Sequence, residues 1–372
     1  MTPKLKSPTR RQLLQMTGGA ALAMPFLSIR AAAQTVNLSM LAWYGHAEPD
    51  IVGEFEEANN VKFTPKYYTG GDNMLGLIAQ SPPGTYDVIL SDAEYVQQLN
   101  AAGYVQELDP ADYPFDDFFP EFQKFPGHWK DDKLFSVITR FGFLGVAYNT
   151  DAFTEKEASS YGLYWDDRVT GKLGQFDWHL PNLGQISLYN GNPSPYDIDE
   201  ATWEKVKETA MSLRPQAGGF FDYGGTFSSL NNGQMLVFSG IGDWITGTLE
   251  KNGSPVRTVI PEQGGLQFTE SFSIGTGTKN YDMARKWIQW ITSPEGQAKS
   301  ANMAAYPCLI PSQAGWKVLN DTNPAEARRQ MMVPGERNVM DLIREGRIQY
   351  RQLPVQQSLE DWNDFWSDYK GA

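Results

Sequence analysis

The sequence predicts an α/β protein built around largely parallel sheets. Short apolar runs alternate with segments of helical spacing along most of the chain, which is typical of parallel strands connected by helices. The chain has 372 residues, of which 41% are hydrophobic and 20% charged, so it is long enough for two domains and can bury a substantial core. Aromatic residues make up 13% of the chain and include 11 Trp, which also suits a pocket lined by rings.

The first 33 residues have the features of an export signal. Arg10 and Arg11 directly precede the apolar stretch LLQMTGGAALAMPFL, and Ala31 and Ala33 form a small-residue cleavage pattern. The apolar stretch is too short and too rich in glycine to span a membrane stably. We therefore expect a twin-arginine signal peptide over residues 1–33, cleavage after Ala33 and export to the periplasm of a bacterium. The alternative is an amphipathic first helix.

The charge of the chain argues against nucleic acid as a partner. The expected signal peptide holds five of the 31 basic residues and none of the 44 acidic ones, so 26 basic against 44 acidic residues give the mature chain a net charge of −18. Such a surface repels phosphate backbones and attracts cations. A solvated acidic surface that only aids solubility would explain the same charge.

Strand-like and helical segments follow one another from residue 36. The run VNLSMLAW is expected to be a strand, and DIVGEFEEANN a helix with Pro49 in its first turn. Next, VKFTPKYY is predicted as a strand, DNMLGLIAQ as a helix, TYDVILSD as a strand and EYVQQLNAAG as a helix ending at Gly103. Ligands of such sheets bind at the carboxyl ends of strands. Two turns occupy that position, Trp43-Tyr44-Gly45-His46 and Ser91-Asp92-Ala93-Glu94.

The second half of the chain contains two candidate crossings between domains. RFGFLGVAYNTDAF and PEQGGLQFTESFSIGTGT are rich in Gly and aromatic residues, and the region near YPCLIPS is expected to cross back. Between the crossings, ATWEKVKETAMSLRP is predicted as a helix, GQMLVFSG as a strand, IGDWITGTLEKNG as a helix start and PVRTVIP as a strand. Beyond them, NYDMARKWIQWITS and SPEGQAKSANMA have helical patterns, and a helical tail rich in Trp and acids ends the chain.

The sequence contains no motif that is typical of catalysis or metal binding. The G-x-S-x-G, H-E-x-x-H, P-loop and C-x-x-C motifs are missing, and the three histidines have no metal-ligand spacing. Tyr67 and Tyr68 could suggest ferric binding, but they are expected to face opposite sides of a strand, one buried and one exposed. Cys308 is the only cysteine and is expected to be a buried thiol. We expect no covalent chemistry, no cofactor and no metal.

The order of these features resembles bacterial periplasmic solute-binding proteins of ABC importers, in particular the spermidine/putrescine-binding group. The resemblance covers the chain from about residue 36 to the end and rests on LSMLAWYGHAEPDIVGEFEEANNVKF, TYDVILSDAEYVQQLNAAGYVQELD, VAYNTDAF, SPVRTVIPEQGGLQFTESFSI and AYPCLIPSQ, in this order. It implies a type II-like fold in which two α/β lobes, each a mixed, mostly parallel sheet flanked by helices, are joined by crossover hinge segments. Lobe 1 would hold residues 36–142 and 271–309, and lobe 2 residues 143–270 and 310–372.

In the polyamine-binding group, aromatic walls contact the methylene chain of the ligand and carboxylates take its ammonium ends. Trp43 matches an aromatic residue of this pattern, although it could also be a core residue at a strand end. Glu270 matches a key acid, and Phe268 matches a tryptophan two residues before it. Tyr306 and Gln349 match a tyrosine and a glutamine. The resemblance therefore implies that these residues contact the ligand.

Other positions depart from the group's pattern in lobe 1. His46 stands where a tyrosine is usual. Asp92 and Glu94 belong to a turn that replaces a Ser-Thr-Tyr turn, so two acids are added to that wall of the cleft. A histidine there could bring pH-dependent binding, or it could be a neutral hydrogen-bonding residue.

Lobe 2 departs further. His179 and Asn182 stand where the group has the Asp and Glu that grip one amine, unless the register shifts by one or two residues and brings in Asp177. A glycine takes the place of the lobe 2 tryptophan, with Asp243 and Trp244 just after it. Because a buried ammonium without a nearby carboxylate is costly, a diamine held at both ends is disfavoured, and a solute with one cationic end fits better.

The resemblance implies a periplasmic binding component that captures a small, amine-containing solute and passes it to an inner-membrane ABC permease. The rings of Trp43, Tyr44, Trp244, Phe268 and Tyr306 suit an amine, and they also suit a sugar, an amino-acid derivative or an opine. We expect a monomer whose closed form is stabilised by the ligand. An exported cofactor-dependent enzyme and a scaffold protein without ligand binding are the alternatives of another class.

Overall fold

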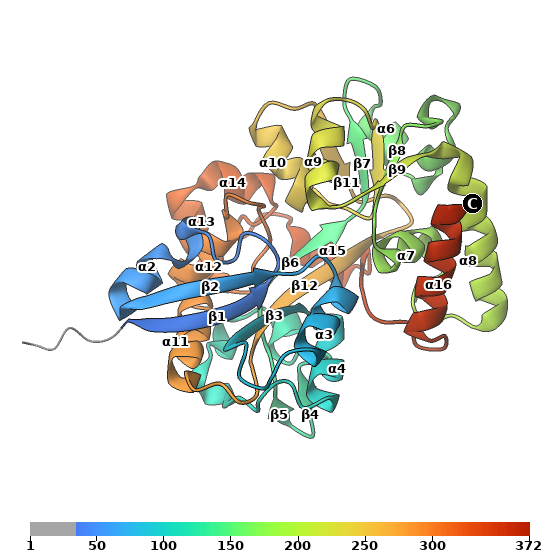
Figure 1. Cartoon of the computed structure of the whole chain (residues 1–372). Helices are drawn as coiled ribbons and strands as arrows, with labels where there is room; N and C mark the ends of the chain where they lie inside the picture. The colour runs from blue at the N-terminus through green and yellow to red at the C-terminus, as the bar shows by residue number, and fades with distance from the viewer. Residues whose placement is uncertain (1–34) are drawn as a thin grey trace, which may run out of the picture. The chain divides into compact units, whose positions relative to one another are not determined.

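Two mixed sheets organise residues 35–372, the part of the chain that the structure, a computed structural model, describes (Figure 1). The expected signal peptide lies outside these residues. The first sheet is formed by β1 (Val36–Ala42), β2 (Val61–Tyr67), β3 (Val88–Asp92), β6 (Val137–Leu144), β12 (Gly265–Ile274) and β13 (Ile348–Tyr350). The second is formed by β7 (Val146–Asn149), β8 (Leu173–Phe176), β9 (Ala217–Phe221), β10 (Val237–Ser239) and β11 (Val256–Val259). A separate hairpin pairs β4 (Trp129–Lys130) with β5 (Lys133–Leu134).

Each sheet has a parallel core of three strands. In the first sheet, β1 lies between β2 and β3 and runs parallel to both, and in the second, β8 lies between β9 and β10 in the same way. Antiparallel strands complete the sheets, because β12 pairs with β3 and β6 while β7 pairs with β10 and β11. The chain passes from the first sheet to the second through β6 and returns through β12. The predicted mixed α/β class with two lobes is therefore confirmed.

Helices cover the first sheet and bury their apolar faces against it. They are α2 (Pro49–Asn59), α3 (Gly71–Ala79), α4 (Val96–Ala101), α11 (Tyr281–Ile291) and α12 (Pro294–Ala301), with a 3₁₀ turn η1 (Ala93–Tyr95) before α4. Helix α2 starts with Pro49 as predicted and ends where Asn60 takes a left-handed conformation, with φ of 50°. The ring of Trp287 on α11 is buried against Phe55 and Phe63, with ring centroids 5.3 and 4.8 Å away.

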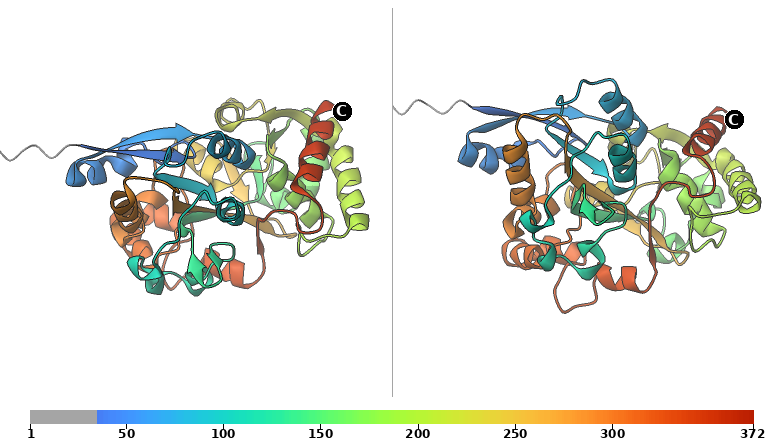
Figure 2. Two further views of the ribbon diagram at one scale, coloured as in Figure 1. Left: turned by 60° about the horizontal axis from the view of Figure 1, so that its bottom comes forward. Right: turned by 90° about the horizontal axis from the view of Figure 1, so that it is seen from below.

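The second sheet is covered by α7 (His179–Tyr189), α8 (Glu200–Leu213), α9 (Tyr223–Asn231), α10 (Asp243–Lys251) and the C-terminal α16 (Leu359–Gly371). Figure 2 shows α16 beside α8 from two further sides. Trp362 fixes this contact, because its ring stacks on Trp203 of α8 with centroids 4.8 Å apart and lies 5.6 Å from Tyr196. The Trp-rich tail predicted from the sequence thus belongs to the core of the second lobe.

The remaining helices and 3₁₀ turns connect these elements. The short helices are α5 (Pro120–Gln123), α6 (Glu155–Ala158), α13 (Gln313–Thr322), α14 (Pro324–Arg329) and α15 (Val339–Arg344). The further 3₁₀ turns are η2 (Pro110–Asp112), η3 (Phe115–Asp117), η4 (Tyr161–Trp165), η5 (Asp167–Val169) and η6 (Arg214–Gln216). None of the helices within residues 35–372 combines the length and apolar character needed to cross a membrane.

Helices α13 and α15 pack with elements of the first lobe, and α14 between them also pairs with α10 through Arg329 and Asp243. Helix α13 lies against α12, and its Trp316 ring contacts Phe119 with centroids 4.7 Å apart. Arg344 of α15 pairs with Glu121 of α5, 2.5 Å away. The expected boundary at residue 310 assigned this segment to lobe 2, and these contacts favour a later one. We propose that lobe 1 extends through α15, β13 and Arg351, whose backbone amide donates to the carbonyl oxygen of Gln267 on β12, and that lobe 2 resumes after Arg351.

Candidate functional site

The carboxyl ends of parallel strands from both sheets meet at one cavity of about 310 Å³. Strands β1, β2 and β3 end at or just before Trp43, Tyr68 and Asp92, and strands β8 and β9 are followed by Asp177 and Asp222. All five residues line the cavity. Side chains at these ends face a shared space because parallel strands of one sheet stop at the same edge.

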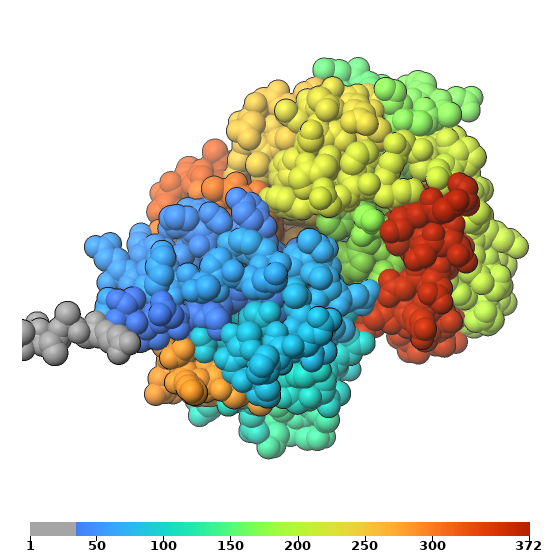
Figure 3. Space-filling view, viewed as in Figure 1, coloured from blue at the N-terminus to red at the C-terminus, as the bar shows by residue number. Residues whose placement is uncertain are grey.

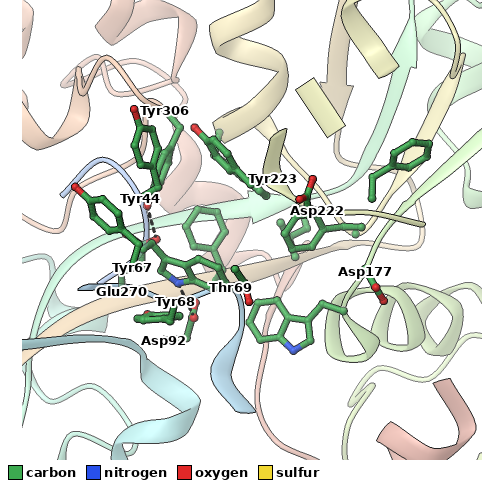
Figure 4. Close-up of a pocket in the computed structure, with 18 of the residues that line it drawn as sticks. Tyr44, Tyr67, Tyr68, Thr69, Asp92, Asp177, Asp222, Tyr223, Glu270 and Tyr306 are labelled. Carbon is green, nitrogen blue, oxygen red and sulfur yellow. Dashed lines mark hydrogen bonds between the residues drawn. The ribbon is translucent and has the colours of Figure 1, made fainter. Parts of the chain in front are cut away.

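We call this cavity the cleft. Aromatic rings form most of its wall (Figure 4). Trp43 and Trp178 come from different sheets, and their ring centroids are 6.0 Å apart. Tyr44 and Tyr223 approach across the cleft in the same way, at 5.9 Å. The aromatic residues of the lining are Trp43, Tyr44, Tyr67, Tyr68, Phe176, Trp178, Phe221, Tyr223, Trp244, Phe268 and Tyr306.

The two lobes also touch directly beside the cleft. The hydroxyl of Tyr223 donates a hydrogen bond of 2.9 Å to the carbonyl oxygen of Ala305. The space-filling view shows the α2–α3 segment (blue) lying against the α9–α10 segment (yellow) (Figure 3). The structure therefore presents the cleft between lobes that contact one another.

A buried cluster of two acids and one arginine forms part of the lobe 1 wall. The Arg351 guanidinium donates from Nη2 to Asp92 Oδ1 and from Nε to Glu94 Oε1, both at 2.6 Å. Asp92 Oδ2 accepts a hydrogen bond of 3.0 Å from the indole Nε1 of Trp43. The Arg351 guanidinium also lies 4.4 Å from the ring centroid of Trp178. One cation thus pairs with two neighbouring carboxylates, and the cluster carries a net negative charge when both are ionised.

The electrostatics of Asp92 reflect that remaining charge. Burial raises the pKa of Asp92, and the nearby Glu94 and Glu270 raise it further. Arg351 and the Trp43 hydrogen bond lower it, and the balance puts the pKa of Asp92 at about 7. A cation placed beside Asp92 would favour its ionised form.

A second buried cluster surrounds Glu270 on β12. Glu270 Oε2 lies 3.2 Å from Arg140 Nε and 3.1 Å from His46 Nε2, and Oε1 accepts a hydrogen bond of 3.2 Å from the Tyr306 hydroxyl. The Arg140 guanidinium lies 4.5 Å from the ring centroid of Tyr306. Burial alone would raise the pKa of Glu270, but Arg140 and His46 lower it, so the carboxylate is ionised and paired. Burial lowers the pKa of His46 and keeps its imidazole neutral.

The lobe 2 wall carries two exposed acids. Asp177 pairs with Lys370 of α16, with Nζ and Oδ1 2.7 Å apart, and accepts a hydrogen bond from the indole of Trp366. Asp222 caps α9 by accepting a hydrogen bond of 2.8 Å from the Gly225 amide. Both acids line the cleft, so its charge is distributed between a buried and an exposed side.

Seven of the residues expected from the sequence line the cleft, and six do not. Those that line it are Trp43, Tyr44, Asp92, Trp244, Phe268, Glu270 and Tyr306. Those that lie outside the lining are His46, Glu94, His179, Asn182, Asp243 and Gln349.

His46 and Glu94 lie one layer behind the cleft surface. His46 contacts Glu270 and Tyr306, and its Nε2 is 2.9 Å from the Tyr306 hydroxyl oxygen. Glu94 contacts Arg351, as described above. Both positions were expected at the ligand because their turns follow β1 and β3, but each side chain instead holds a lining residue in place.

His179 and Asn182 are buried inside lobe 2 and do not line the cleft. Asn182 donates hydrogen bonds of 2.7 and 2.8 Å to the carbonyl oxygens of Phe176 and Trp178, and it accepts one of 2.6 Å from Ser239. His179 is buried at the start of α7, where burial lowers the pKa to about 3. Asp177, which a shifted register would bring in, does line the cleft.

Asp243 and Gln349 are occupied elsewhere. Asp243 accepts a hydrogen bond of 2.5 Å from Arg329 of α14 and lines a second cavity of about 280 Å³ on another side of Trp244 and Phe268. Gln349 on β13 donates its side-chain amide to the carbonyl oxygen of Gly346, 2.8 Å away. Arg351, two residues further along, reaches the cleft instead.

Several lining residues were not anticipated from the sequence. Tyr67 and Tyr68 both line the cleft, although alternation along a strand predicted opposite directions, because β2 ends at Tyr67 and Tyr68 lies beyond it. Tyr68 is buried and Tyr67 half-buried. Trp178 and Tyr223 stand two residues beyond the ends of β8 and β9, close to the position that Trp43 takes one residue beyond β1. This strand-end position was a usable signal. Cys308 is a buried free thiol as predicted, and burial raises its pKa to about 12.

Comparison with known proteins gives relatives that cover most of this chain. The spermidine/putrescine-binding periplasmic protein of Salmonella typhimurium is 23% identical over 339 residues, which are 88% of this chain and 90% of the relative. The spermidine/putrescine ABC transporter substrate-binding protein of Streptococcus pneumoniae superposes with a TM-score of 0.71 at 16% identity, over 90% of this chain and 99% of that one. The binding protein MotA of A. tumefaciens, solved with glucopine, has a TM-score of 0.69 at 13% identity, over 90% and 100%. These two structures share the fold.

The family is shown by the sequence itself. Residues 50–319 match the family described as bacterial extracellular solute-binding protein, and this range spans most of the described chain. It includes the cleft-lining residues of both walls from Tyr67 to Tyr306, whereas Trp43, Tyr44 and Arg351 lie outside it. The chain therefore belongs to the bacterial extracellular solute-binding proteins, and it is the solute-binding component of an ABC transporter.

Proposed function

We propose that the protein captures a small amine-containing solute in the cleft between its lobes and delivers it to an inner-membrane ABC permease. In this proposal the mature chain is a periplasmic monomer, exported through its twin-arginine signal, and it catalyses no reaction. The observation that carries the proposal is the buried Asp92 carboxylate beside aromatic rings. A volume of about 310 Å³ suits a small molecule.

The buried charges of the cleft favour a cationic ligand. Asp92, Glu94 and Glu270 are buried acids, and Arg140 and Arg351 are the buried cations that pair with them. Because His46 is neutral, these groups leave one uncompensated negative charge when all three acids are ionised. An ammonium group beside Asp92 would compensate it, and a buried charge is tolerated only when it is paired.

The aromatic lining supports the same ligand class. A cation over the face of a Trp or Tyr ring gains about 0.5–2 kcal/mol when it is shielded from water. Trp43 and Trp178 face the cleft next to Asp92 and Arg351, so an amine there would contact a carboxylate and a ring together. Relatives named for binding spermidine and putrescine also handle amines, which is consistent with the proposal.

Ligand binding would stabilise the closed arrangement of the lobes. A solute between Trp43 of lobe 1 and Trp178 of lobe 2 contacts both walls, so its affinity for a closed form exceeds that for an open form. The equilibrium between the two forms then shifts toward closure. The β6 and β12 crossings would serve as the hinge in this movement.

The test is native mass spectrometry of the mature protein as purified, followed by release and identification of any bound molecule. We expect a stoichiometric amine, or, if none co-purifies, a rise in unfolding temperature with amines in a thermal-shift screen. A bound sugar or another solute without an amine would contradict the ligand class and leave the transport role standing. A tightly bound redox cofactor would contradict the proposed absence of enzymatic activity.

A further inference from the structure

Two arginines inside the protein already make the contacts that a ligand ammonium would make. Arg351 pairs with Asp92 and Glu94 and lies 4.4 Å from the ring centroid of Trp178. Arg140 pairs with Glu270 and lies 4.5 Å from the ring centroid of Tyr306. Each guanidinium therefore combines a carboxylate with an aromatic face, as an amine bound in such a cleft would.

The two arginines differ in how much negative charge they leave unpaired for a ligand. Arg140 pairs with one acid, so that pair is neutral, and His46 and Tyr306 complete the contacts of Glu270. Arg351 is shared by two acids, so its cluster carries one negative charge when both acids are ionised. The buried side of the cleft consequently has a place for one additional cation and not for two.

The acids of the lobe 2 wall do not provide a place for a second buried cation. Asp177 is paired with Lys370, and its carboxylate is exposed. Asp222 is exposed and already accepts the Gly225 amide as the cap of α9. Exposed carboxylates gain little from an ion pair because water screens the charges. A second ammonium would therefore lose its hydration in the cleft without a buried partner.

We propose that Arg351 is a specificity-determining residue that limits the solute to one buried ammonium group, so that the cleft selects monoamines over diamines. The inference rests on the proposed function, because it assumes an amine ligand in the cleft. It narrows the ligand class to solutes with one ammonium end and an uncharged remainder. Removing Arg351 would free a second carboxylate and admit a second ammonium.

The experiment compares two probes with the same carbon chain, butylamine with one ammonium and putrescine with two. Isothermal titration at constant ionic strength measures both dissociation constants for the wild-type protein. We expect butylamine to bind at least about tenfold more tightly than putrescine, since a buried charge without a partner is strongly disfavoured. Equal affinities, or tighter binding of putrescine, would overturn the inference.

Substitutions of Arg351 test whether this residue sets the preference. In Arg351→Gln, we expect the ratio of the two affinities to shift toward putrescine by about tenfold or more. Arg351→Lys keeps the positive charge and should keep the wild-type preference. Arg337→Gln is a matched control, because it removes one positive charge from an exposed pair with Glu345 outside the cleft lining, and it should leave the ratio unchanged. An unchanged ratio in folded Arg351→Gln would overturn the inference.

Two further results complete the test. If thermal unfolding shows that Arg351→Gln does not fold, the wild-type affinity ratio and the ratio in Arg351→Lys test the inference. A loss of the preference in folded Arg351→Lys would assign the role to guanidinium geometry and not to charge, and would contradict the inference. If wild-type protein binds neither amine at millimolar concentration, the proposed function fails and the inference fails with it. Binding of putrescine in preference to butylamine contradicts only the inference and leaves the proposed function intact.

Discussion

The two walls of the cleft are built from equivalent strand ends and carry different chemistry. On the lobe 1 wall, Asp92, Glu270 and Arg351 are buried and joined into clusters with a second arginine and a histidine. On the lobe 2 wall, the acids that follow β8 and β9 are exposed, and the remaining lining is aromatic apart from Gly240. Buried charges are sensitive to the charge of a ligand, whereas exposed charges are screened.

This difference assigns separate tasks to the lobes. The lobe 1 wall holds its charged side chains in buried ion pairs and would respond to the charge of the solute. The lobe 2 wall offers rings that can pack on many solutes and would supply the contacts that close the cleft. Variants that act on one wall alone should therefore change either charge recognition or closure.

The largest expected effect comes from breaking the Glu270 cluster. In Glu270→Gln the buried Arg140 loses its carboxylate partner, and losing one partner of a buried pair costs about 3–5 kcal/mol. We expect the free energy of unfolding to fall by about this amount in urea titrations. The exposed pair of Arg337 and Glu345 is the control, because Glu345→Gln should change the free energy of unfolding by less than about 1 kcal/mol. Equal effects of the two variants would contradict the buried pairing.

Next is the loss of the carboxylate that is proposed to meet the ligand. Asp92→Asn removes the excess charge of the Arg351 cluster, and we expect the affinity for the physiological amine to fall about 100-fold, as for a charged hydrogen bond. Asp222→Asn is the matched control on the lobe 2 wall, because asparagine also caps helices and the acid is exposed. Calorimetry of both variants should show a change below about threefold for Asp222→Asn. A larger loss of affinity in Asp222→Asn than in Asp92→Asn would indicate that the ligand's cation binds at the lobe 2 wall.

The pH dependence of binding should follow Asp92. Since burial and neighbouring Glu94 and Glu270 raise its pKa to about 7 in spite of Arg351, part of the Asp92 population is protonated at neutral pH without ligand. An ammonium ligand favours the ionised form, so it must displace a proton at low pH. We expect the affinity to be about tenfold weaker at pH 6 than at pH 8. A pH profile that stays the same in Asp92→Asn as in the wild type would show that another group titrates.

A smaller effect is expected from the rings. Trp43→Ala removes a ring of the cleft and the indole hydrogen bond to Asp92, and we expect about tenfold weaker binding. Trp165→Ala is the control, because Trp165 stacks on Tyr189 outside the cleft lining. Titration of both variants separates ligand contact from general loss of packing. Unchanged affinity in Trp43→Ala would remove this ring from the binding site.

The smallest effects are expected at sequence-predicted residues that the structure places elsewhere. Asn182→Ala should leave affinity within about twofold of the wild type but reduce the free energy of unfolding by about 1–3 kcal/mol, because two carbonyl oxygens and the Ser239 hydroxyl lose their partner. Gln349→Ala should change neither quantity appreciably, since its side chain bonds only Gly346 locally. A large loss of affinity in either variant, measured calorimetrically, would return that residue to the site.

The fold was predictable because its signals are local. Hydrophobic spacing located the helix that begins at Pro49, and apolar runs located the strands that end near Trp43 and Asp92. The same strand-end rule that identified these two residues applies to Trp178 and Tyr223, although the resemblance drew attention to His179 and Asn182 instead. The family pattern placed them at the ligand, but α7 turns their side chains into the lobe 2 core.

The buried ion pairs could not be predicted from the sequence. Arg351 and Asp92 are separated by 259 positions, and Arg140 and Glu270 come from the two strands of the crossing. No local pattern indicates which distant cation neutralises which acid, because the pairing depends on how β13 and β6 join the first sheet. The sequence indicated acids at the cleft and not the arginines that pair with them, so the charge available to a ligand follows only from the tertiary structure.

The most direct test of the account is a crystal structure of the mature protein with the amine that it binds. The account predicts an ammonium nitrogen within hydrogen-bond distance of Asp92, with Trp43 and Trp178 against the ligand on either side. The Arg351 and Arg140 pairs should remain as they are. An ammonium held by Asp177 or Asp222 with no contact to Asp92 would contradict the assignment of charge recognition to lobe 1.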